Sequence, residues 1–551
     1  MQDAIAANLA EYGSLAGHVR RAARERPDQP ALRHRGRTLT WSELDTLVES
    51  VAAGLRGLGA PDSAGHPARV AIALPNIPEF AIAFFATLRA GLVAVPVNPG
   101  YTARELRHVL EDSGASVLVA TDSVAAAVAG ISSELDALRW AYTCSGTEDA
   151  SAGEPLGRAA RSAVSALARA LARDVAPNPR PPAQTDLAVL LYTSGTEGAP
   201  KGAMLSHRAL IANHVQLAAV EPAIMDGDDT VLLALPMFHA YGLNSGLGAV
   251  AFHGACGVLA DRFDAEESLR LITEEQVTVV VGVPSMYTLW ASTLTSGAPL
   301  ATVRVAVCGA APLEAVTARK FTAITGIDVN IGYGLTETAP VVSSTLVSPA
   351  PKIGSIGRPL PGLELRLVSG SGDDVWHAGS SDLTDFEGEG ELELEAPDSP
   401  GSDPGEIVVR GANLFDGYWP DGRGGPTAEG WWATGDVAYA DGDGDLFLVD
   451  RIGELIIVNG FNVYPYEVEL VLTAHPGVAE AAVLGAPDPV RGQTVRAFVV
   501  RAAGSTVDET ELARHCERNL ARFKCPTQIS FVPELPHSAI GKVRKVLLRD
   551  V

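Results

Sequence analysis

The chain has 551 residues, between three and four times a typical domain of about 150, so more than one domain is expected. Hydrophobic residues make up 47% and charged residues 20%, a composition that excludes a wholly disordered chain. The 42 Lys and Arg against 66 Asp and Glu give a formal net charge of −24, so a general affinity for nucleic acid or anionic membranes is not expected.

Cysteine usage and apolar stretches point to a reducing, aqueous compartment. The five cysteines are scattered without a CxxC pair, which favours neither a disulfide framework nor a zinc site. The first residues lack a basic segment followed by an apolar one, and the longest apolar stretch, 81–97, contains Arg89 and is shorter than the roughly 20 residues of a membrane span. We expect a cytoplasmic monomer or homodimer with no integral membrane segment.

Helical and strand patterns alternate through the first 120 residues. Helical spacing of apolar residues predicts helices at 41–55, 78–89 and 102–113. Short apolar runs predict buried strands at 70–74, 92–97 and 116–120. This βαβ rhythm predicts an α/β fold with doubly wound, mixed sheets.

The rest of the chain divides by composition. A Pro-rich linker is predicted near 174–185 after a helical segment at 157–173, and a second βα series follows from Leu187 to about 343, with strands at 277–281 and 303–307. Residues 369–405, rich in Gly, Ser, Asp, Glu and Pro, form an exposed acidic insertion or a long hairpin, and a β-rich subdomain follows. We therefore predict a large N-terminal domain at 1–449, a hinge at 450–453 and a small, mobile α+β C-terminal domain at 454–551.

The string from Leu190 to Gly202 carries the clearest chemistry. It follows an apolar run and combines hydroxyl side chains, glycines and Lys201 before a helix start near Ser206. Backbone N–H groups and hydroxyls surround phosphate oxygens well, and a lysine compensates their charge. The spacing is not that of a GxxxxGK[ST] loop, and an ordinary turn is the alternative.

This string resembles the phosphate-binding signature of the adenylate-forming superfamily, which includes acyl-CoA synthetases, luciferases and peptide-synthetase adenylation domains. Further strings similar to those of the superfamily occur in the expected order over nearly the whole chain, at 73–76 with 98–99, 235–239, 308–313, 332–337, 431–436, 450–465 and 540–545. Two positions depart from the pattern. The usual second Thr is Glu197, which we expect to point outward, and the usual Lys or Asp of the hinge is Gly453, whose backbone is freer to rotate.

The resemblance implies an enzyme that uses ATP, Mg²⁺ and coenzyme A on a small-molecule carboxylic acid. The acid would first become acyl-AMP with release of pyrophosphate, and the thiol would then displace AMP. By the same resemblance Lys542 stabilises the first transition state, Glu337 and Thr193 hold magnesium, and His239 lines the acyl site. Without the family string, Lys542 would be read as a solvated lysine in a basic tail.

The resemblance also implies a nucleotide site. The phosphates would meet Thr193, Ser194, Gly195, Thr196, Gly198 and Lys201. The adenine and magnesium strings contribute Gly309, Ala310, Ala311, Gly332, Tyr333, Gly334 and Thr336. Asp436 and Arg451 would bind the ribose, and Lys542 the α-phosphate.

The acid and its acceptor are predicted from two further segments. Residues 459–469 most resemble bacterial fatty-acyl-CoA synthetases, with Gly460 and Phe461 along the pantetheine path. Gly242 and Gly246 would give a helix a small apolar face that leaves room for an alkyl chain, unless they serve helix packing. We predict an ATP-dependent fatty-acid–CoA ligase for medium- or long-chain acids. The alternatives are an aryl- or other carboxylate–CoA ligase, an acyl-AMP ligase that loads a carrier protein, and a catalytically silent nucleotide- or acyl-binding protein.

Overall fold

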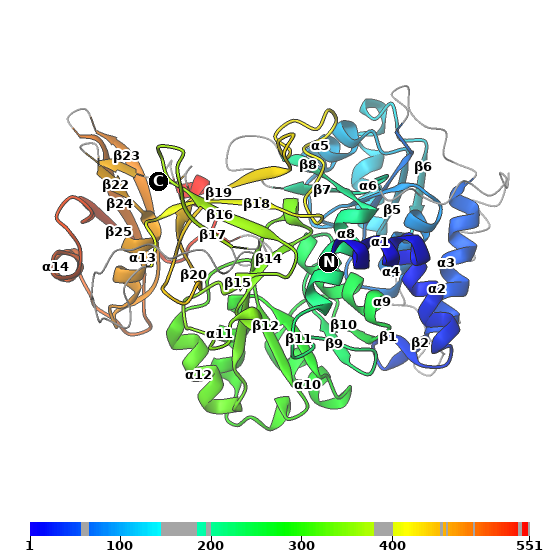
Figure 1. Cartoon of the computed structure of the whole chain (residues 1–551), viewed down its shortest axis with the longest axis horizontal. Helices are drawn as coiled ribbons and strands as arrows, with labels where there is room; N and C mark the ends of the chain where they lie inside the picture. The colour runs from blue at the N-terminus through cyan, green and yellow to red at the C-terminus, as the bar shows by residue number, and fades with distance from the viewer. Residues whose placement is uncertain are drawn as a thin grey trace. The chain divides into compact units, whose positions relative to one another are not determined.

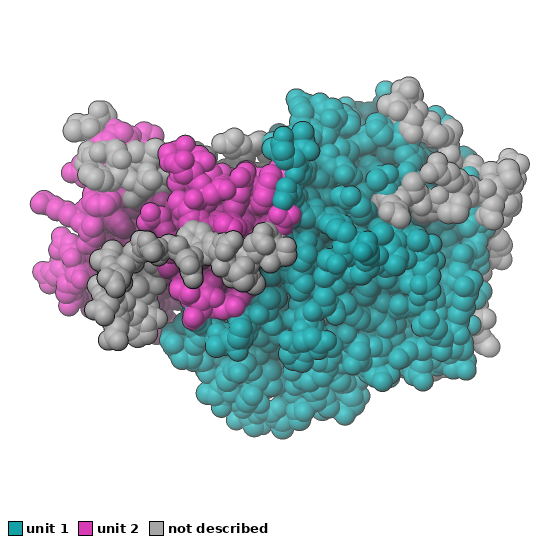
Figure 2. All heavy atoms as spheres, viewed as in Figure 1, with its two compact units in different colours: residues 1–354, 359–363, 410–430 teal, residues 355–358, 364–409, 431–551 magenta. Residues whose placement is uncertain are grey.

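The computed structural model of the chain describes residues 1–56, 66–144, 185–193, 200–378, 401–451, 454, 456–458, 461–488, 491–537 and 543–548. By compactness the chain forms two units (Figure 2): residues 1–354, 359–363 and 410–430 make unit 1, and residues 355–358, 364–409 and 431–551 make unit 2. Both units combine helices with sheets, which confirms the predicted α/β class. The predicted helix at 157–173, nearly all of the linker near 174–185 and most of the insertion near 369–405 lie outside the described residues.

The larger of the two doubly wound sheets has nine strands (Figure 1). Their order is β15 (Arg358–Pro359), β14 (Val341–Ser344), β13 (Val329–Gly334), β12 (Val305–Cys308), β11 (Val279–Gly282), β9 (Thr230–Leu233), β10 (Cys256–Leu259), β1 (Pro30–His34) and β2 (Arg37–Thr40). The six pairings from β13 to β2 are parallel except β1–β2, and β14 runs antiparallel to β13. β10 and β11 are buried along their whole length, as parallel strands covered on both faces must be.

A six-stranded sheet holds the first predicted βαβ units. Its order is β6 (Trp140–Thr143), β5 (Val117–Ala120), β3 (Arg69–Ala73), β4 (Val93–Pro96), β7 (Leu187–Thr193) and β8 (Lys201–Ser206). The pairings are parallel except β7–β8, which is an antiparallel pair. The three strands predicted before residue 121 correspond to β3, β4 and β5.

The helices of unit 1 begin and end where local signals place them. α5 begins with a capping box in which Thr102 and Glu105 exchange side-chain-to-backbone hydrogen bonds, and α4 has proline at its first position. The described helices are α1 (Gln2–Tyr12), α2 (Leu15–Glu25), α3 (Trp41–Arg56), α4 (Pro78–Arg89), α5 (Ala103–Ser113), α6 (Asp122–Ala129), α8 (His207–Ala218), the π-helix η3 (Tyr241–Gly248), α9 (Ala249–His253), α10 (Ala265–Glu274), α11 (Pro284–Thr293) and α12 (Ala315–Thr325). Short 3₁₀ turns are η1 (Ser132–Glu134), η4 (Ala298–Leu300), η5 (Thr336–Thr338) and η6 (Thr345–Val347).

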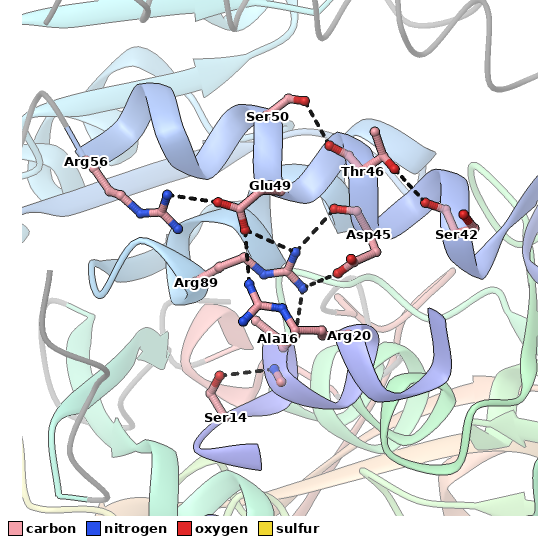
Figure 3. Close-up of polar contacts among 11 residues, drawn as sticks. Ser14, Ala16, Arg20, Ser42, Asp45, Thr46, Glu49, Ser50, Arg56 and Arg89 are labelled. Carbon is pink, nitrogen blue, oxygen red and sulfur yellow. Dashed lines mark hydrogen bonds and ion pairs between the residues drawn. The ribbon is translucent and has the colours of Figure 1, made fainter. Parts of the chain in front are cut away.

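Arg89, the charge that interrupts the longest apolar stretch, joins three packed helices (Figure 3). At the end of α4 its side chain is only 5% exposed; its guanidinium lies 2.6 Å from Asp45 of α3 and donates to the carbonyl of Ala16 in α2 at 2.8 Å. Glu49 of α3 lies 3.7 Å away and also accepts from Arg20 at 3.1 Å. The buried cation is thereby neutralised within a helix–helix contact. Among the described residues, no helix is both long and apolar enough to cross a membrane.

Unit 2 contains two further sheets. One has the order β17 (Asp374–Ala378), β16 (Glu364–Val368), β18 (Gly405–Arg410), β19 (Trp431–Ala440) and β20 (Leu446–Arg451). The other has the order β22 (Phe461–Val463), β21 (Ile456–Val458), β24 (Gly492–Arg501) and β23 (Val478–Asp488), with β25 (Gln528–Phe531) paired to β24. Helices α13 (Pro465–Thr473) and α14 (Glu509–Asn519) pack on this second sheet around a core that includes Val468, Leu472, Val483 and Leu512, and η8 (Lys545–Leu548) follows.

Three histidine rings, of which His18 and His214 are buried, contact Phe252 in unit 1. The ring centroids of His18, His214 and His253 lie 4.7, 5.0 and 5.1 Å from that of Phe252. Burial lowers the pKa of His18 to about 2, that of His214 to about 3 and that of His253 to about 4. The folded protein therefore holds these rings neutral at pH values where an unfolded chain would protonate them.

We expect the folded state to lose stability in mild acid. Because the pKa values of these histidines are lower in the folded than in the unfolded chain, their contribution to the free energy of unfolding is complete above the unfolded pKa of about 6.5. It is lost as the pH falls from there towards the folded pKa values. At pH 5 each histidine lowers the free energy of unfolding by about 2 kcal/mol. Urea unfolding at pH 7 and pH 5 measures the loss. His18→Phe keeps a ring and removes one titrating group, so its loss should be about 2 kcal/mol smaller. An unchanged pH dependence would show that His18 does not contribute.

Candidate active site

The carboxyl ends of four neighbouring parallel strands bring several predicted site residues to one edge of the nine-stranded sheet. β9, β11, β12 and β13 pair side by side, and the segments that follow them begin at residues 234, 283, 309 and 335. A Cβ atom added to Gly309 would lie 2.9 Å from Cζ of Tyr241 and 3.1 Å from the carbonyl oxygen of Gly332. The acyl-site string and the two adenine strings therefore meet here, where ligands bind in sheets of this kind.

The predicted phosphate loop is held by a β-hairpin. Thr193 at the end of β7 lies opposite Lys201 at the start of β8. Residues 194–199, and with them the predicted contacts of Ser194, Gly195, Thr196 and Gly198, lie outside the described residues. On its other side β8 meets residues 417–419: the amide of Met204 donates to the carbonyl of Gly417 at 3.0 Å, and the amide of Trp419 donates to that of Gly202 at 2.8 Å.

Tyr418 links this hairpin to Glu337. Its hydroxyl donates to Oε1 of Glu337 at 2.6 Å, and Nζ of Lys201 lies 5.4 Å from the centroid of its ring. The amide of Phe415 donates to the carbonyl of Glu337 at 2.9 Å. Lys201, Tyr418 and Glu337 thus form one cluster of a cation, a phenol and a carboxylate. Sequence reasoning missed Tyr418, although the run of Gly417, two aromatic residues and Pro420 in a loop was a usable signal.

The oxygen atoms of Glu337 and Thr193 suit a hard cation. Glu337 is only 7% exposed, on the turn η5, and β8 packs against η5. The described residues contain no group of three or more His, Cys, Asp or Glu side chains arranged around a metal. A magnesium ion bound here would therefore take most of its ligands from phosphates and water, as Mg²⁺ does in nucleotide sites.

Three buried asparagines hold the chain that follows Glu337. Asn413 Nδ2 donates to the carbonyl of Thr338 at 2.7 Å, Asn244 Nδ2 to that of Ala339 at 2.7 Å, and Asn213 Nδ2 to that of Val341 at 2.8 Å. The amide of Val341 donates back to Oδ1 of Asn213 at 3.1 Å. Buried amides whose hydrogen bonds are all made fix a single backbone arrangement. Sequence reasoning missed all three.

The glycines around Tyr333 differ in what surrounds them. Tyr333 is buried in β13, opposite Ser343 of β14. A Cβ atom at Gly334 would lie 1.8 Å from the carbonyl oxygen of Pro340, whereas at Gly332 the nearest atom would be Cγ1 of Val307, 3.8 Å away. Gly334 is therefore required by a close approach of two backbones, whereas a Cβ atom at Gly332 would make only an ordinary van der Waals contact. Thr336 lies in η5, beside Glu337, and the neighbouring Ala310 and Ala311 follow Gly309, with Ala310 at a φ of 69°.

His239, which the resemblance places at the acyl site, lies in the turn between β9 and η3. Its Nδ1 accepts from the amide of Tyr241 at 3.3 Å. Asn76 holds the preceding segment: its Nδ2 donates to the carbonyl of Leu235 at 2.8 Å, and its Oδ1 accepts from the amide of Met237 at 3.1 Å. His239 is thus positioned by its own turn and by a residue that precedes it by 163 positions in the sequence.

Gly242 and Gly246, at which the sequence predicts either an alkyl groove or helix packing, lie in the π-helix η3. A Cβ atom at Gly242 would lie 2.3 Å from the carbonyl oxygen of Pro236, and one at Gly246 would lie 3.2 Å from Cδ2 of Leu233. Both glycines thus let η3 pack closely on β9 and the segment after it. Helix packing, the alternative open in the sequence, accounts for both positions.

Two hydroxyls on η3 have no hydrogen-bond partner among the described residues. They belong to Tyr241, which is buried, and Ser245. Residues four apart in a π-helix lie on nearly the same face. Burial, with a smaller contribution from Cys308, raises the pKa of the Tyr241 phenol well above 10, so it remains a hydrogen-bond donor. The ring of Tyr241 lies beside Gly309.

The predicted ribose residues belong to unit 2. Asp436 in β19 is 4% exposed and lies opposite Arg451 of β20, of which the backbone is described. The amide of Asp436 donates to Oγ1 of Thr434 at 3.1 Å, and the amide of Gly435 donates to Oε1 of Glu406 at 3.0 Å. The backbone of Phe461 lies in β22, opposite Val458. Gly453, Gly460 and Lys542 lie outside the described residues.

Comparison with known proteins gives consistent family matches. The family model described as AMP-binding enzyme matches residues 19–419, and that of the AMP-binding enzyme C-terminal domain matches residues 467–542. The chain is 34% identical to a long-chain-fatty-acid–CoA ligase of Yersinia pestis, over 98% of this chain and 94% of the relative, and 37% identical to a feruloyl-CoA synthase of Amycolatopsis sp, over 95% and 96%.

Solved structures extend the likeness to the whole fold. ATP-bound MatB from Rhodopseudomonas palustris matches with a TM-score of 0.81 and 30% identity, covering 97% of this chain and 98% of that one. The anthranilate CoA ligase AuaEII in complex with anthranoyl-AMP matches with a TM-score of 0.81 and 26% identity, covering 99% and 98%.

Proposed function

The chain belongs to the family of AMP-binding enzymes, and we propose that it joins a carboxylic acid to coenzyme A in two half-reactions driven by ATP. The family membership predicted from the sequence strings is confirmed. AMP-forming acid–CoA ligases use ATP, Mg²⁺ and coenzyme A. The observation that carries the proposal is the cluster of Lys201, Tyr418 and Glu337 beside the phosphate hairpin.

The first half-reaction needs positioning and charge neutralisation. A carboxylate oxygen attacks the α-phosphorus of ATP, the bond to the bridging oxygen of pyrophosphate breaks, and acyl-AMP forms. The nucleophile is already ionised, so no general base is required. Lys201 and the hairpin would hold the phosphates, Tyr418 would orient Glu337, and Lys542 would stabilise charge on the α-phosphate. Oxygens of Glu337 and Thr193 would hold Mg²⁺, which would supply further neutralisation of phosphate charge.

The second half-reaction transfers the acyl group. The thiol sulfur of coenzyme A attacks the acyl carbonyl carbon, the bond to the AMP oxygen breaks, and the thiol proton leaves to solvent. Asp436 and Arg451 would keep the ribose in place through both steps. Gly460 and Phe461 would border the pantetheine arm, and Gly453 would be the pivot between the two arrangements.

Two classes of acid have support. The sequence prediction of a medium- or long-chain fatty acid agrees with the name of the Yersinia pestis relative. An aromatic acid with a polar ring substituent agrees with the name of the Amycolatopsis relative and with the unpartnered hydroxyls of Tyr241 and Ser245. A buried hydroxyl without a partner costs about 1–3 kcal/mol, which a polar group on the acid would relieve and an alkyl chain would not. The geometry therefore favours the aromatic class.

Pyrophosphate release from a panel of acids, measured in wild type and in Tyr241→Phe, separates the aromatic from the fatty acids. We expect 4-hydroxylated aromatic acids to release pyrophosphate more efficiently than the unsubstituted acids and than octanoic or palmitic acid. Tyr241→Phe should raise the KM of the hydroxylated acid by about tenfold, the effect of one hydrogen bond, and leave that of the unsubstituted acid unchanged. The KM for ATP is the internal control. If palmitic acid is the best substrate and the variant behaves like wild type, the fatty-acid class stands.

A further inference from the structure

Lys545 is held between two carboxylates in unit 2. Its side chain, in η8, is 17% exposed, and its Nζ lies 2.7 Å from Oε2 of Glu454 and 2.8 Å from Oε1 of Glu469. Burial alone would lower the pKa of Lys545, but Glu469 and Glu454 together raise it above its usual value. The ammonium is therefore charged at physiological pH and is paired with both carboxylates in the folded unit.

The two carboxylates come from different parts of unit 2, one beside the proposed hinge and one in helix α13. Glu454 directly follows Gly453, the proposed hinge. Glu469 belongs to α13, and its Oε1 also accepts from the amide of Val483 in β23 at 2.7 Å, so it is anchored to the sheet. Lys545 itself follows Lys542 by three residues. A single ammonium thus joins the first residue after the hinge, the folded core and the chain next to Lys542.

We propose that Lys545 is a positioning residue that makes the chain after the hinge and the chain beside Lys542 move as one body. The proposal rests on the proposed function, which gives Lys542 its contact with the α-phosphate. Without the ion pair between Lys545 and Glu454, the residues after the hinge could change conformation by themselves when the hinge rotates. The rotation would then not determine the position of Lys542. A misplacement of about 1 Å at a reacting centre costs on the order of 10²-fold in rate. Thioester formation does not use Lys542, so it should be spared.

The chain offers two matched controls. Glu469→Gln removes the same charge from the same lysine, at the carboxylate that does not adjoin the hinge. Lys524→Met breaks another ion pair of α13, in which Nζ of Lys524 lies 2.7 Å from both carboxylate oxygens of Glu467. Both variants perturb the unit without touching the link from Lys545 to the hinge.

The test compares the two half-reactions in Glu454→Gln. We expect acid-dependent pyrophosphate release to fall by at least about tenfold, with thioester formation from synthetic acyl-AMP and coenzyme A within about twofold of wild type. Lys545→Arg, which keeps both ion pairs, should retain pyrophosphate release. Glu469→Gln and Lys524→Met should lower the melting temperature without changing the ratio of the two rates.

Two outcomes would overturn the proposal. If Glu454→Gln lowers both half-reactions equally, or lowers neither, Lys545 has a structural role only. If Lys524→Met changes the ratio of the two half-reaction rates to the same extent, the change results from a general perturbation of unit 2. It does not then result from loss of the ion pair between Lys545 and Glu454. Failure of the proposed function is separate, because it would appear in wild type as an absence of acid-dependent pyrophosphate release.

Discussion

Replacing Lys542 with alanine is expected to slow acyl-AMP formation by about 10²–10³-fold, equivalent to about 3–4 kcal/mol of transition-state stabilisation. The reason is electrostatic. As the carboxylate attacks, negative charge gathers on oxygens around the α-phosphorus, and a lysine there opposes it more strongly than in the ground state. Thioester formation from synthetic acyl-AMP and coenzyme A should continue, because that step starts after pyrophosphate has left.

The measurement is pyrophosphate release and thioester formation, assayed separately. Arg544→Ala is the matched control, since Arg544 is exposed and lies two residues away. A loss caused by the general positive charge of this segment would appear in both variants. Adenylation at the wild-type rate in Lys542→Ala would remove Lys542 from the mechanism.

Gly334→Ala is expected to destabilise unit 1 by more than about 3 kcal/mol and to slow adenylation by about 10²-fold. The added Cβ would lie 1.8 Å from the carbonyl oxygen of Pro340, so β13 and the chain after Glu337 must separate. Since Glu337 lies between Gly334 and Pro340 in the sequence, its carboxylate moves when these two residues separate. The expected readouts are a lower unfolding midpoint and a higher Mg²⁺ requirement.

Gly332→Ala is the control for this prediction. Its Cβ would meet Val307 at an ordinary 3.8 Å, so stability should change by no more than about 1 kcal/mol. If the nucleotide occupies the space beside Gly332, the KM for ATP rises in this variant while the unfolding midpoint stays. Equal destabilisation by both substitutions would contradict the packing described for β13.

Much of the fold follows from local patterns in the sequence. The periodic apolar residues of α3, the proline that begins α4 and the capping box of α5 are all contained in short segments, so these helices were predictable. β3 and β11 are uninterrupted apolar runs, which indicate buried parallel strands. Boundaries differ by one to three residues, because hydrogen-bond partners decide where an element ends.

The site was predictable only where its residues fall in compact strings. Lys201 and Glu337 lie in such strings, whereas Tyr418 follows Glu337 by 81 positions and Asn413 follows Thr338 by 75. A hydroxyl or an amide so far along the sequence from its partner gives no local periodic signal. Tertiary folding alone determines which residue it contacts. Asn213 in α8 gave no distinct signal either, because the same helix also contains His207, Arg208, His214 and Gln216.

The glycines of η3 show a different limit of sequence reasoning, because one pattern of small residues fits two structures. Small residues at 242 and 246 were compatible with an open groove and with close packing, and no local feature separates the two. The contacts with Pro236 and Leu233 select packing. The polar pair Tyr241 and Ser245 on the same helix, whose hydroxyls have no partner among the described residues, is the basis of the proposed aromatic acid.

The most direct test of the central claim is isotope transfer from the acid to AMP. Because a carboxylate oxygen forms the bond to the α-phosphorus and stays with AMP when coenzyme A takes the acyl group, a substrate acid with both carboxyl oxygens replaced by ¹⁸O should give AMP that carries one ¹⁸O atom. Mass spectrometry of AMP and acyl-CoA after complete turnover measures this. We expect singly labelled AMP in equal amount to acyl-CoA. Unlabelled AMP, or ¹⁸O in inorganic phosphate with ADP as the product, would contradict it.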